Sequence, residues 1–561
     1  MFAIYGRADA ALRTKACIRD WLTANKPSKN QLGTSHFVKQ ASLTETLRFQ
    51  IEREWDYQVR RFMFRKHPVP GTEFDAIGSF LWPSKDDSIS IDALGPSFEA
   101  LDKIRMDESC YVVWDAKQSL FKVFGNAKNV QKSLIRLRMV CFQIVARHMP
   151  GCRMFLLDLT DTHSIPTHIR LVPYEHPAIL APPGARQPTP SLTPVSEGSS
   201  TCTCSGIQDS TDETSSRNVD LIKACLLQVL PKLHYFCGYL QLRLRLGTFL
   251  NTQFKRAPEN CYTLGDYGDM MRQSQFAGYV TPHIGDRMIE SRLLSTIKEA
   301  GHILLPEDHR IDKLEDVQPT YAATFTFQER SSYLRLMVEW RKAVEPGRET
   351  DTMERILTKW IKFNKEDDAL LDVSLVNVQG GLAWQFDLIG AQSIDEANLP
   401  RELIEFSQKL DVIPDVAHTA NTYALFVQFP HTSLLQSLQQ RIVYRYDLKP
   451  IVTGYTLEVS RLQDHVVPQT SHGSAFVGKS PSIIYEARWA VSLYRNDWDS
   501  MFSSNESLPV GARANWPDDF GIWFPDEGQK RGFHVLMGKL RVVQSLTEHA
   551  TEDLLTGMSI G

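Results

Sequence analysis

The stretch Gly238-Tyr-Leu-Gln-Leu-Arg-Leu-Arg-Leu-Gly-Thr-Phe249 decides the fold class of the largest part of the chain. Within it, an apolar set alternates with a polar set: Leu240, Leu242, Leu244 and Leu246 against Gln241, Arg243 and Arg245. Successive side chains of a β-strand point to opposite faces, so residues 238–254 are predicted to form a strand that is buried on one face. Such strands are typical of antiparallel sheets with one wet face.

The surrounding sequence extends this sheet. Gly380-Gly381, between two apolar runs, is a strong signal for a two-residue β-hairpin. Further strands are predicted at 321–327, 333–340, 356–363, 371–379, 382–389, 423–429, 440–446 and 455–459, and helices at 219–233, 289–300, 400–410 and 533–555. The strands are not separated by regular crossover helices, so the predicted class is α+β, with a C-terminal body of mainly antiparallel sheet.

A short phrase occurs twice in the N-terminal third. Phe2-Ala-Ile-Tyr-Gly6 and Phe121-Lys-Val-Phe-Gly125 each open a helical stretch with an apolar stripe. A short strand, a glycine and an amphipathic helix are typical of the end of a KH-type nucleic-acid module. We therefore predict a complete module over residues 70–150, and the last part of a truncated one over residues 1–25.

Inside the 70–150 module, the sequence predicts a strand at 88–91, a helix at 96–105, a hairpin of 110–114 with 120–124, and a final helix at 126–148. A KH module holds the nucleic-acid backbone at a Gly-x-x-Gly loop. That loop should fall at Gly95-Pro-Ser-Phe98, where Phe98 replaces the second glycine and Pro96 lacks an N–H donor. A phosphate cradle is therefore not expected, and the module could be a degenerate KH fold kept for packing or protein contact.

Two groups of basic residues are candidates for nucleic-acid binding. The final helix of the module carries Lys128, Lys132, Arg136 and Arg138 and no acid, and the first three form a stripe. Its partner could be RNA or an acidic protein surface, and a solvated face is the plain alternative. On the C-terminal sheet, bases occur beside aromatic residues and could bind a single strand. Their alternation equally fits aromatics inward and bases outward; the bases are Arg243, Arg245, Arg335, Lys359, Arg441 and Arg445.

Two weaker patterns leave an enzyme as an alternative. Gly473, Gly478, Lys479 and Ser480 match a phosphate-binding loop, although the preceding residues do not end a buried strand and Pro481 follows at once. Carboxylates and imidazoles between Asp158 and His168 could bind a metal or transfer protons, but their spacing matches no metal motif: they are Asp158, Asp161, His163 and His168. We predict no catalytic residue, metal or cofactor.

Composition sets the domain boundaries and the compartment. Residues 176–218 are rich in Pro, Ser, Thr and Gly and are predicted to be a disordered linker in front of an α+β body at 219–561, which could divide near 400–420. The formal net charge is −4, no apolar run is long enough to span a membrane, and all nine cysteines precede Tyr262. The expected compartment is the cytoplasm or nucleus; Asp9 and Asp20 argue against a mitochondrial presequence.

The stretch from 233 to 249, together with 74–82 and 95–105, resembles a family of uncharacterised proteins from filamentous fungi. The resemblance implies degenerate KH-like segments followed by a domain of unknown function, and it brings no catalytic residues. We therefore expect a non-enzymatic, intracellular protein that is associated with RNA or acts as a scaffold. A purely protein-binding module is the other non-enzymatic possibility.

Overall fold

The computed structural model describes residues 13–19, 45–83, 89–159, 168–174, 189–195, 205–284, 287–329, 332–345, 348–364, 369–378, 381–417, 424–467 and 483–557. The chain divides into two compact units, Met1–Met63 and Phe64–Gly561. The first unit contains helical residues 13–19 and most of α2 (Glu45–Arg65). The predicted strand at 2–6 lies outside the described residues, so the repeat is not tested there.

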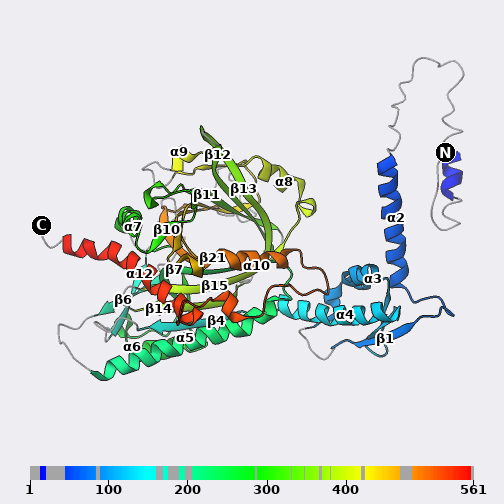
Figure 1. Ribbon diagram of the computed structural model, residues 1–561, viewed down its shortest axis with the longest axis horizontal. Helices are drawn as coiled ribbons and strands as arrows, with labels where there is room; N and C mark the ends of the chain where they lie inside the picture. The colour runs from blue at the N-terminus through cyan, green and yellow to red at the C-terminus, as the bar shows by residue number, and fades with distance from the viewer. Residues whose placement is uncertain are drawn as a thin grey trace, which may run out of the picture. The chain divides into compact units, whose positions relative to one another are not determined.

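The second unit begins with a small α+β module (Figure 1). Its elements are β1 (Ala76–Leu81), the 3-10 helices η1 (Ile91–Leu94) and η2 (Pro96–Leu101), α3 (Asp102–Asp107), β2 (Tyr111–Asp115), β3 (Leu120–Gly125) and α4 (Ala127–Arg147). The strands form an antiparallel sheet in the order β1-β3-β2. Helix α4 covers one face so closely that a Cβ on Gly78 would lie 2.8 Å from Val130 Cγ1.

The hairpin and the long last helix of this module are confirmed, but the predicted strand at 88–91 is wrong. The first strand is β1, and the region after it turns into η1. The Ser90 side chain accepts a hydrogen bond from the Asp92 backbone N–H and caps that helix, while Ile89 and Leu94 are buried in the module core. Ile91, which was expected in a strand, is instead the first residue of this helix.

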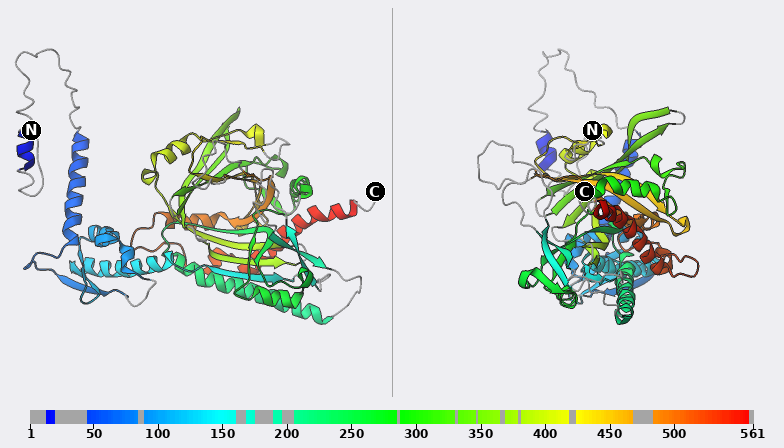
Figure 2. Two further views of the ribbon diagram at one scale, coloured as in Figure 1. Left: turned by 180° about the vertical axis from the view of Figure 1, so that it is seen from behind. Right: turned by 90° about the vertical axis from the view of Figure 1, so that its left-hand side faces the viewer.

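Eight strands of the C-terminal body close into an antiparallel barrel (Figure 1; Figure 2). In ring order they are β7 (Tyr239–Gln253), β15 (Leu382–Ser393), β13 (Arg348–Asn364), β12 (Ser332–Glu345), β11 (Thr320–Glu329), β18 (Leu435–Leu448), β19 (Tyr455–Val466) and β21 (Arg488–Arg495), which pairs with β7 again. The α+β class and the antiparallel pairing are thus confirmed. The β13–β15 contact is short: Ile361 pairs with Ser393 and Lys362 with Gln392.

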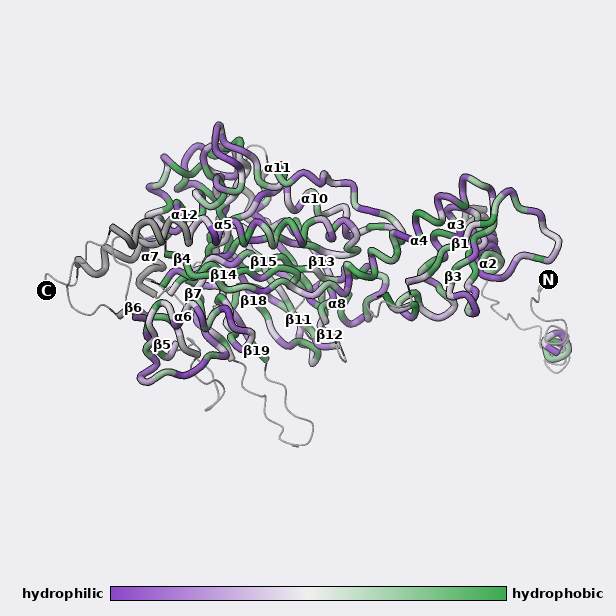
Figure 3. The backbone as a smooth tube through the Cα atoms, turned by 90° about the horizontal axis from the view of Figure 1, so that it is seen from below, coloured by the Kyte–Doolittle hydropathy of each residue, from purple (hydrophilic) through white to green (hydrophobic). Residues whose placement is uncertain are grey.

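The alternation along β7 has the predicted consequence. Its leucines are buried in the largest apolar core, which they share with α5 (Ser205–Leu233) and α12 (Gly532–Gly557). Its polar residues point to the inside of the barrel. Figure 3 shows the same mixture of hydrophobic and hydrophilic residues along the strands of the body. The wet face of the sheet is therefore the barrel interior, which the sequence alone did not indicate.

The predicted linker is wrong where the structure describes it. Residues 189–195 form β6 (Thr189–Val195), which pairs with β5 (His168–Tyr174) and touches β7 at Ser191. Residues 205–218 are the start of α5. Leu192 is buried in an apolar core, and β6 pairs with β5 through backbone hydrogen bonds that composition does not reveal.

The division into an N-terminal third and a separate body is also wrong. Strand β4 (Cys152–Asp158) runs parallel to β14 (Ala369–Asn377), which continues the sheet from β15. A further division near 400–420 is not seen either, because β11 pairs with β18 across that region. Helices α8 (Arg401–Gln408) and α9 (Pro414–Ala417) come between β11 and β18 in the sequence. They cover the outer faces of both strands. Of the strand predicted at 423–429, only β17 (Val427–Gln428) forms.

Gly247→Ala tests the close approach of β7 to the segment before α7 (Arg287–Glu299). A Cβ at Gly247 would lie 1.8 Å from the Thr281 carbonyl oxygen, so one of the two backbones must move. We expect a loss of about 2–3 kcal/mol in the free energy of unfolding, measured by chemical denaturation. Gly265→Ala is the matched control in α6 (Leu264–Met271), where a Cβ meets nothing within 4 Å. An equal loss in both variants would contradict the packing explanation.

Candidate functional site

The barrel encloses a lumen of about 800 Å³. Side chains from all eight strands line it, and most of them are polar. Six are basic, Arg243, Arg245, Arg335, Lys359, Arg441 and Arg445, and five are acidic, Glu307, Glu339, Glu458, Asp464 and Asp499. Eight-stranded barrels either fill with side chains or hold one small ligand. This lumen is of the size that suits a ligand and is charged throughout.

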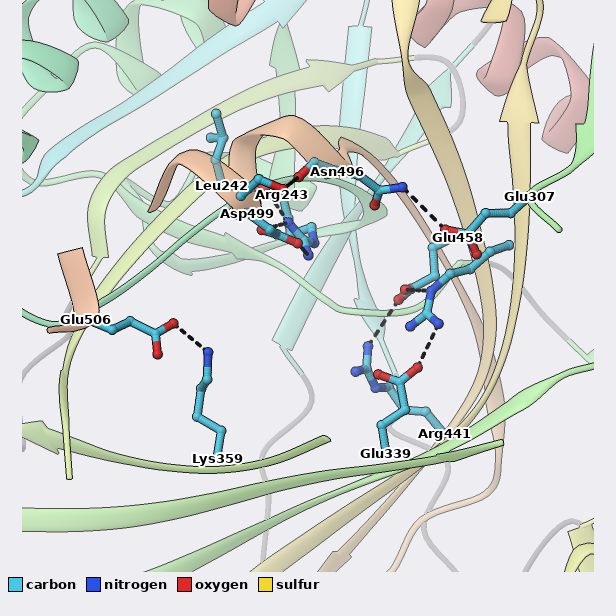
Figure 4. Close-up of polar contacts among 12 residues, drawn as sticks. Leu242, Arg243, Glu307, Glu339, Lys359, Arg441, Glu458, Asn496, Asp499 and Glu506 are labelled. Atoms are coloured by element: carbon cyan, nitrogen blue, oxygen red, sulfur yellow. Dashed lines mark hydrogen bonds and ion pairs between the residues drawn. The ribbon is translucent and has the colours of Figure 1, made fainter. Parts of the chain in front are cut away.

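A chain of ion pairs crosses three of the strands (Figure 4). Arg445 on β18 contacts Glu339 on β12 at 2.6 Å and Glu458 on β19 at 3.2 Å. Arg441, four residues before Arg445 on the same face of β18, contacts the other oxygen of Glu458 at 3.2 Å. All four side chains are less than a third exposed. Arg445 is therefore the centre of a buried network that ties β12, β18 and β19 together.

Helix α10 (Asn496–Glu506) supplies two acids that pair with lumen bases: Asp499, which lines the lumen, and Glu506, which does not line it but binds Lys359 (Figure 4). Asp499 accepts two hydrogen bonds from Arg243, at 2.8 and 2.6 Å, and Glu506 accepts one from Lys359 at 2.5 Å. The first pair joins α10 to β7 and the second joins it to β13. Because β13 and β15 pair over only two residues, these contacts also hold the ring together where its strands separate.

Three of the lumen cations lie over aromatic rings. Arg243 is 4.0 Å from the centroid of Tyr494, Arg335 is 4.2 Å from Phe363, and Lys359 is 4.8 Å from Tyr239; these are cation–π contacts. Bases and aromatic rings thus meet at three places in the lumen, and binding of a single strand by this sheet stays a prediction. The larger aromatic set, including Trp340 and Trp360, packs instead on the outer side under α8.

The basic surroundings keep the central carboxylate ionised. Burial by itself would raise the pKa of Glu458, but Arg441, Arg445 and Arg243 together lower it below its usual value. Glu307 differs: burial raises its pKa, and Arg445 and a hydrogen bond from Asn496 offset this only in part. The lumen thus contains one strongly held anion and one carboxyl that burial disfavours in its charged form.

The basic stripe predicted on α4 is only partly free. Lys128, Lys132 and Arg138 are exposed, although Lys132 Nζ lies 4.0 Å from Glu108. Arg136 contacts Asp107 at 2.9 Å and donates to the Val510 carbonyl at 2.9 Å. It therefore joins the module to the body and is not available to an external partner in this arrangement.

The loop at Gly95–Phe98 packs one of its side chains against the core of the module. Ser97 and Phe98 have positive φ values of 59° and 55°, and the Phe98 ring packs at 5.4 Å from Phe121 in the module core. The Phe98 carbonyl accepts a hydrogen bond from the buried Arg105. The position of the missing second glycine is thus filled by a core side chain.

The two enzyme alternatives receive no support from the described residues. The loop with Gly473, Gly478, Lys479 and Ser480 lies outside them, as do Asp161 and His163. Asp158 ends β4, which pairs with β14, whereas His168 begins β5, which pairs with β6 and β8 (Cys261–Thr263). In the part of the chain that the structure describes, no three His, Cys, Asp or Glu residues are grouped as a metal site would need.

Sequence analysis missed the acids that complete the lumen. Glu339 and Glu458 alternate with buried residues on β12 and β19, so period two would have placed them on the wet face. Asp499 and Glu506 are seven residues apart on α10 and share one face of it, a weaker signal. No local pattern indicates which base each of them binds.

A protein-family model described as a domain of unknown function, DUF7905, matches residues 206–529, which is more than half of the chain. The chain belongs to the DUF7905 family. The matched residues contain all eight barrel strands and α10, so the lumen lies within the matched part of this chain. The 70–150 module precedes that domain, and its KH-like character stays a prediction.

A search of curated proteins gave no match. None of the described helices has the length and apolar content needed to cross a bilayer.

Arg445→Ala tests the central ion pairs. It leaves Glu339 without its arginine and Glu458 with Arg441 alone, and breaking a buried pair on one side costs about 3 kcal/mol. We expect a loss of that size in the free energy of unfolding at pH 7. Arg401→Ala, which removes an exposed pair with Glu405, should change it by less than about 0.5 kcal/mol.

The pH dependence of the stability difference between the parent and Arg445→Ala distinguishes charge pairing from packing. Because the folded-state pKa of Glu458 is lowered, its pairing stabilises the protein above the pKa of the unfolded chain, and this is lost as the pH falls through the folded value. The difference between the parent and Arg445→Ala should therefore shrink on acidification below about pH 4. A difference that stays constant from pH 7 to pH 3 would show that packing, not charge, accounts for it.

Proposed function

We propose that the protein is a binding protein rather than an enzyme, and that its barrel lumen takes up one small polar molecule without net charge. The observation that carries this proposal is a lumen of about 800 Å³ lined by charges that are already paired with one another. Carboxylates fixed by arginines are poor proton donors or acceptors at neutral pH. They suit holding a ligand better than transferring protons.

The balance of charge favours an uncharged or zwitterionic ligand. Six bases face the lumen, and the acids that line it or pair with those bases are seven, the five lining residues together with Asp387 and Glu506. A ligand of either net sign would meet a group of its own sign close to every partner. Fixed pairs of this kind give specificity against the wrong charge.

The remaining surface of the lumen favours many hydrogen bonds over ring stacking. The aromatic faces of Tyr239, Phe363 and Tyr494 are each contacted by a cation, so they are poor platforms for a nucleobase. Neutral hydroxyl and amide groups come from four neighbouring strands: Thr324, Thr326, Ser437, Gln439, Ser460 and Ser492. Together these features fit a polyhydroxylated molecule, such as a sugar or polyol.

Thr324→Trp tests lumen binding by filling it. The purified full-length protein is incubated with a cell extract of molecules below 1 kDa and examined by native mass spectrometry. We expect a one-to-one adduct whose mass identifies an uncharged or zwitterionic polar compound, and its loss in Thr324→Trp. Thr358→Trp, at an exposed position of β13, is the control and should keep the adduct. No adduct, or one that persists in Thr324→Trp, contradicts the proposal.

RNA association through the 70–150 module is a second candidate. It is supported by the order of elements, with a central last strand, Gly125 and the long α4, as the KH-like interpretation expects. The exposed bases of α4, Lys128, Lys132 and Arg138, would be the contacts. Arg243 and Arg245, which were also candidates, are less suited, because Asp499 and Asp387 already bind them inside the barrel.

The seven described cysteines are free thiols, which suits the expected cytoplasm or nucleus.

The triple variant Lys128→Glu, Lys132→Glu, Arg138→Glu tests this candidate. Phosphate contacts release counterions, so losing up to three of them should weaken binding to a single-stranded RNA and reduce the salt slope by about 2. Arg272→Glu, Lys313→Glu, Arg401→Glu makes the same charge change at exposed sites of the body and should have little effect. Equal weakening by both triples would indicate nonspecific attraction only. Failure here leaves the lumen proposal standing.

A further inference from the structure

Strand β1 is the free edge of the module sheet. In the order β1-β3-β2, it pairs with β3 along its whole length, Ala76 with Gly125 through Leu81 with Leu120, and no other described strand pairs with it. Its second edge therefore presents backbone N–H and C=O groups that can accept another strand. Proteins protect such edges with charges, prolines, bulges or very short strands.

Edge β1 has none of these protections. Its six residues, Ala-Ile-Gly-Ser-Phe-Leu, include no charge and no proline, and its register with β3 has no bulge. On the face away from α4, Ile77 and Leu81 are 66% and 71% exposed, and Ser79 between them is also exposed. A flat, uncharged edge with two exposed aliphatic side chains is a template for pairing.

The strand is complementary to itself. If two copies pair antiparallel about a two-fold axis at Ser79, residues whose numbers add to 158 face one another. Ile77 of each copy then meets Leu81 of the other, Ser79 meets Ser79, and all of these side chains lie on the same face of a six-stranded sheet. Aliphatic cross-strand pairs are favourable, and no like charges meet along the strand.

The charges next to the edge are compatible with this pairing. Lys122, which lies opposite Ser79 on β3, is paired with Asp115 at 2.9 Å, so it is neutralised within its own copy. Such an isologous contact closes on itself and leads to a dimer, not a fibre. We propose that the protein forms a homodimer through antiparallel pairing of β1 with β1 about Ser79. A single pair of six-residue strands buries little surface, so the dimer is weak and depends on concentration.

Cross-linking at the axis gives the decisive test. The full-length chain is prepared with Cys17, Cys202 and Cys204 replaced by serine, and Ser79→Cys is added. Under mild oxidation by diamide at about 50 μM protein, which lies in the micromolar-to-millimolar range of weak contacts, we expect a disulfide-linked dimer on a non-reducing gel. Ser295→Cys, an exposed serine of α7, is the control and should stay monomeric.

Further variants test the register and the edge. Ile77→Cys alone should not cross-link, because it faces Leu81, whereas Ile77→Cys with Leu81→Cys should. Adding Ile77→Lys to Ser79→Cys should abolish the cross-link, and sedimentation velocity of Ile77→Lys should show a monomer where the parent shows a concentration-dependent dimer. A parent that remains monomeric, or a Ser79→Cys chain that does not cross-link or does so equally with Ile77→Lys, overturns the proposal.

Discussion

Charge pairing inside the barrel is the constraint on which the rest of the structure depends. A strand that buries its leucines on the outside must turn its arginines inward, and an unpaired buried ion costs several kcal/mol. Every base of the lumen for which a carboxylate partner is described draws that partner from another strand or from α10. The acids of β12, β19 and α10 therefore have to lie where β7, β13 and β18 place the bases.

This requirement also explains the position of α10. One side of α10 carries Asp499 and Glu506, and hydrogen bonds to other segments of the body hold the helix in place. Trp498 donates to the Trp523 carbonyl, and Asn505 donates to the carbonyls of Leu233 and Phe236 at the end of α5. One helix thus links the charged interior to the apolar core outside the ring.

The sequence predicted the elements better than their arrangement. Period-two alternation identified β7, and the Gly380-Gly381 signal identified the β14–β15 hairpin, because both are local. The same alternation is expected for a strand facing solvent and for one facing a lumen, so closure of the ring could not be read from it. Closure depends on pairs such as Leu246 with Val491, which no local pattern specifies.

The errors have the same origin. Low apolar content made residues 176–218 look like a linker, yet β6 pairs with β5 through its backbone and buries Leu192. Four-residue spacing placed Arg136 on a stripe with Lys128 and Lys132, but its partners are Asp107 and the Val510 carbonyl, which lie 29 and 374 positions away in the chain. Spacing indicates which residues share a face and not what that face touches.

The order of the barrel strands has a consequence for synthesis of the protein. Strand β7 pairs with β21, the last strand of the ring, and Leu246 precedes its partner Val491 by 245 residues. At the usual rate of about 5–20 residues per second, the ribosome needs about 12–50 s to supply that partner. During this time β7 can pair with β6, with β9 (Ala277–Val280) and, once it is made, with β15, but the edge at Leu244–Leu246 that β21 takes has no partner. The nascent chain must therefore keep an open, leucine-rich strand edge from aggregating until translation is almost complete.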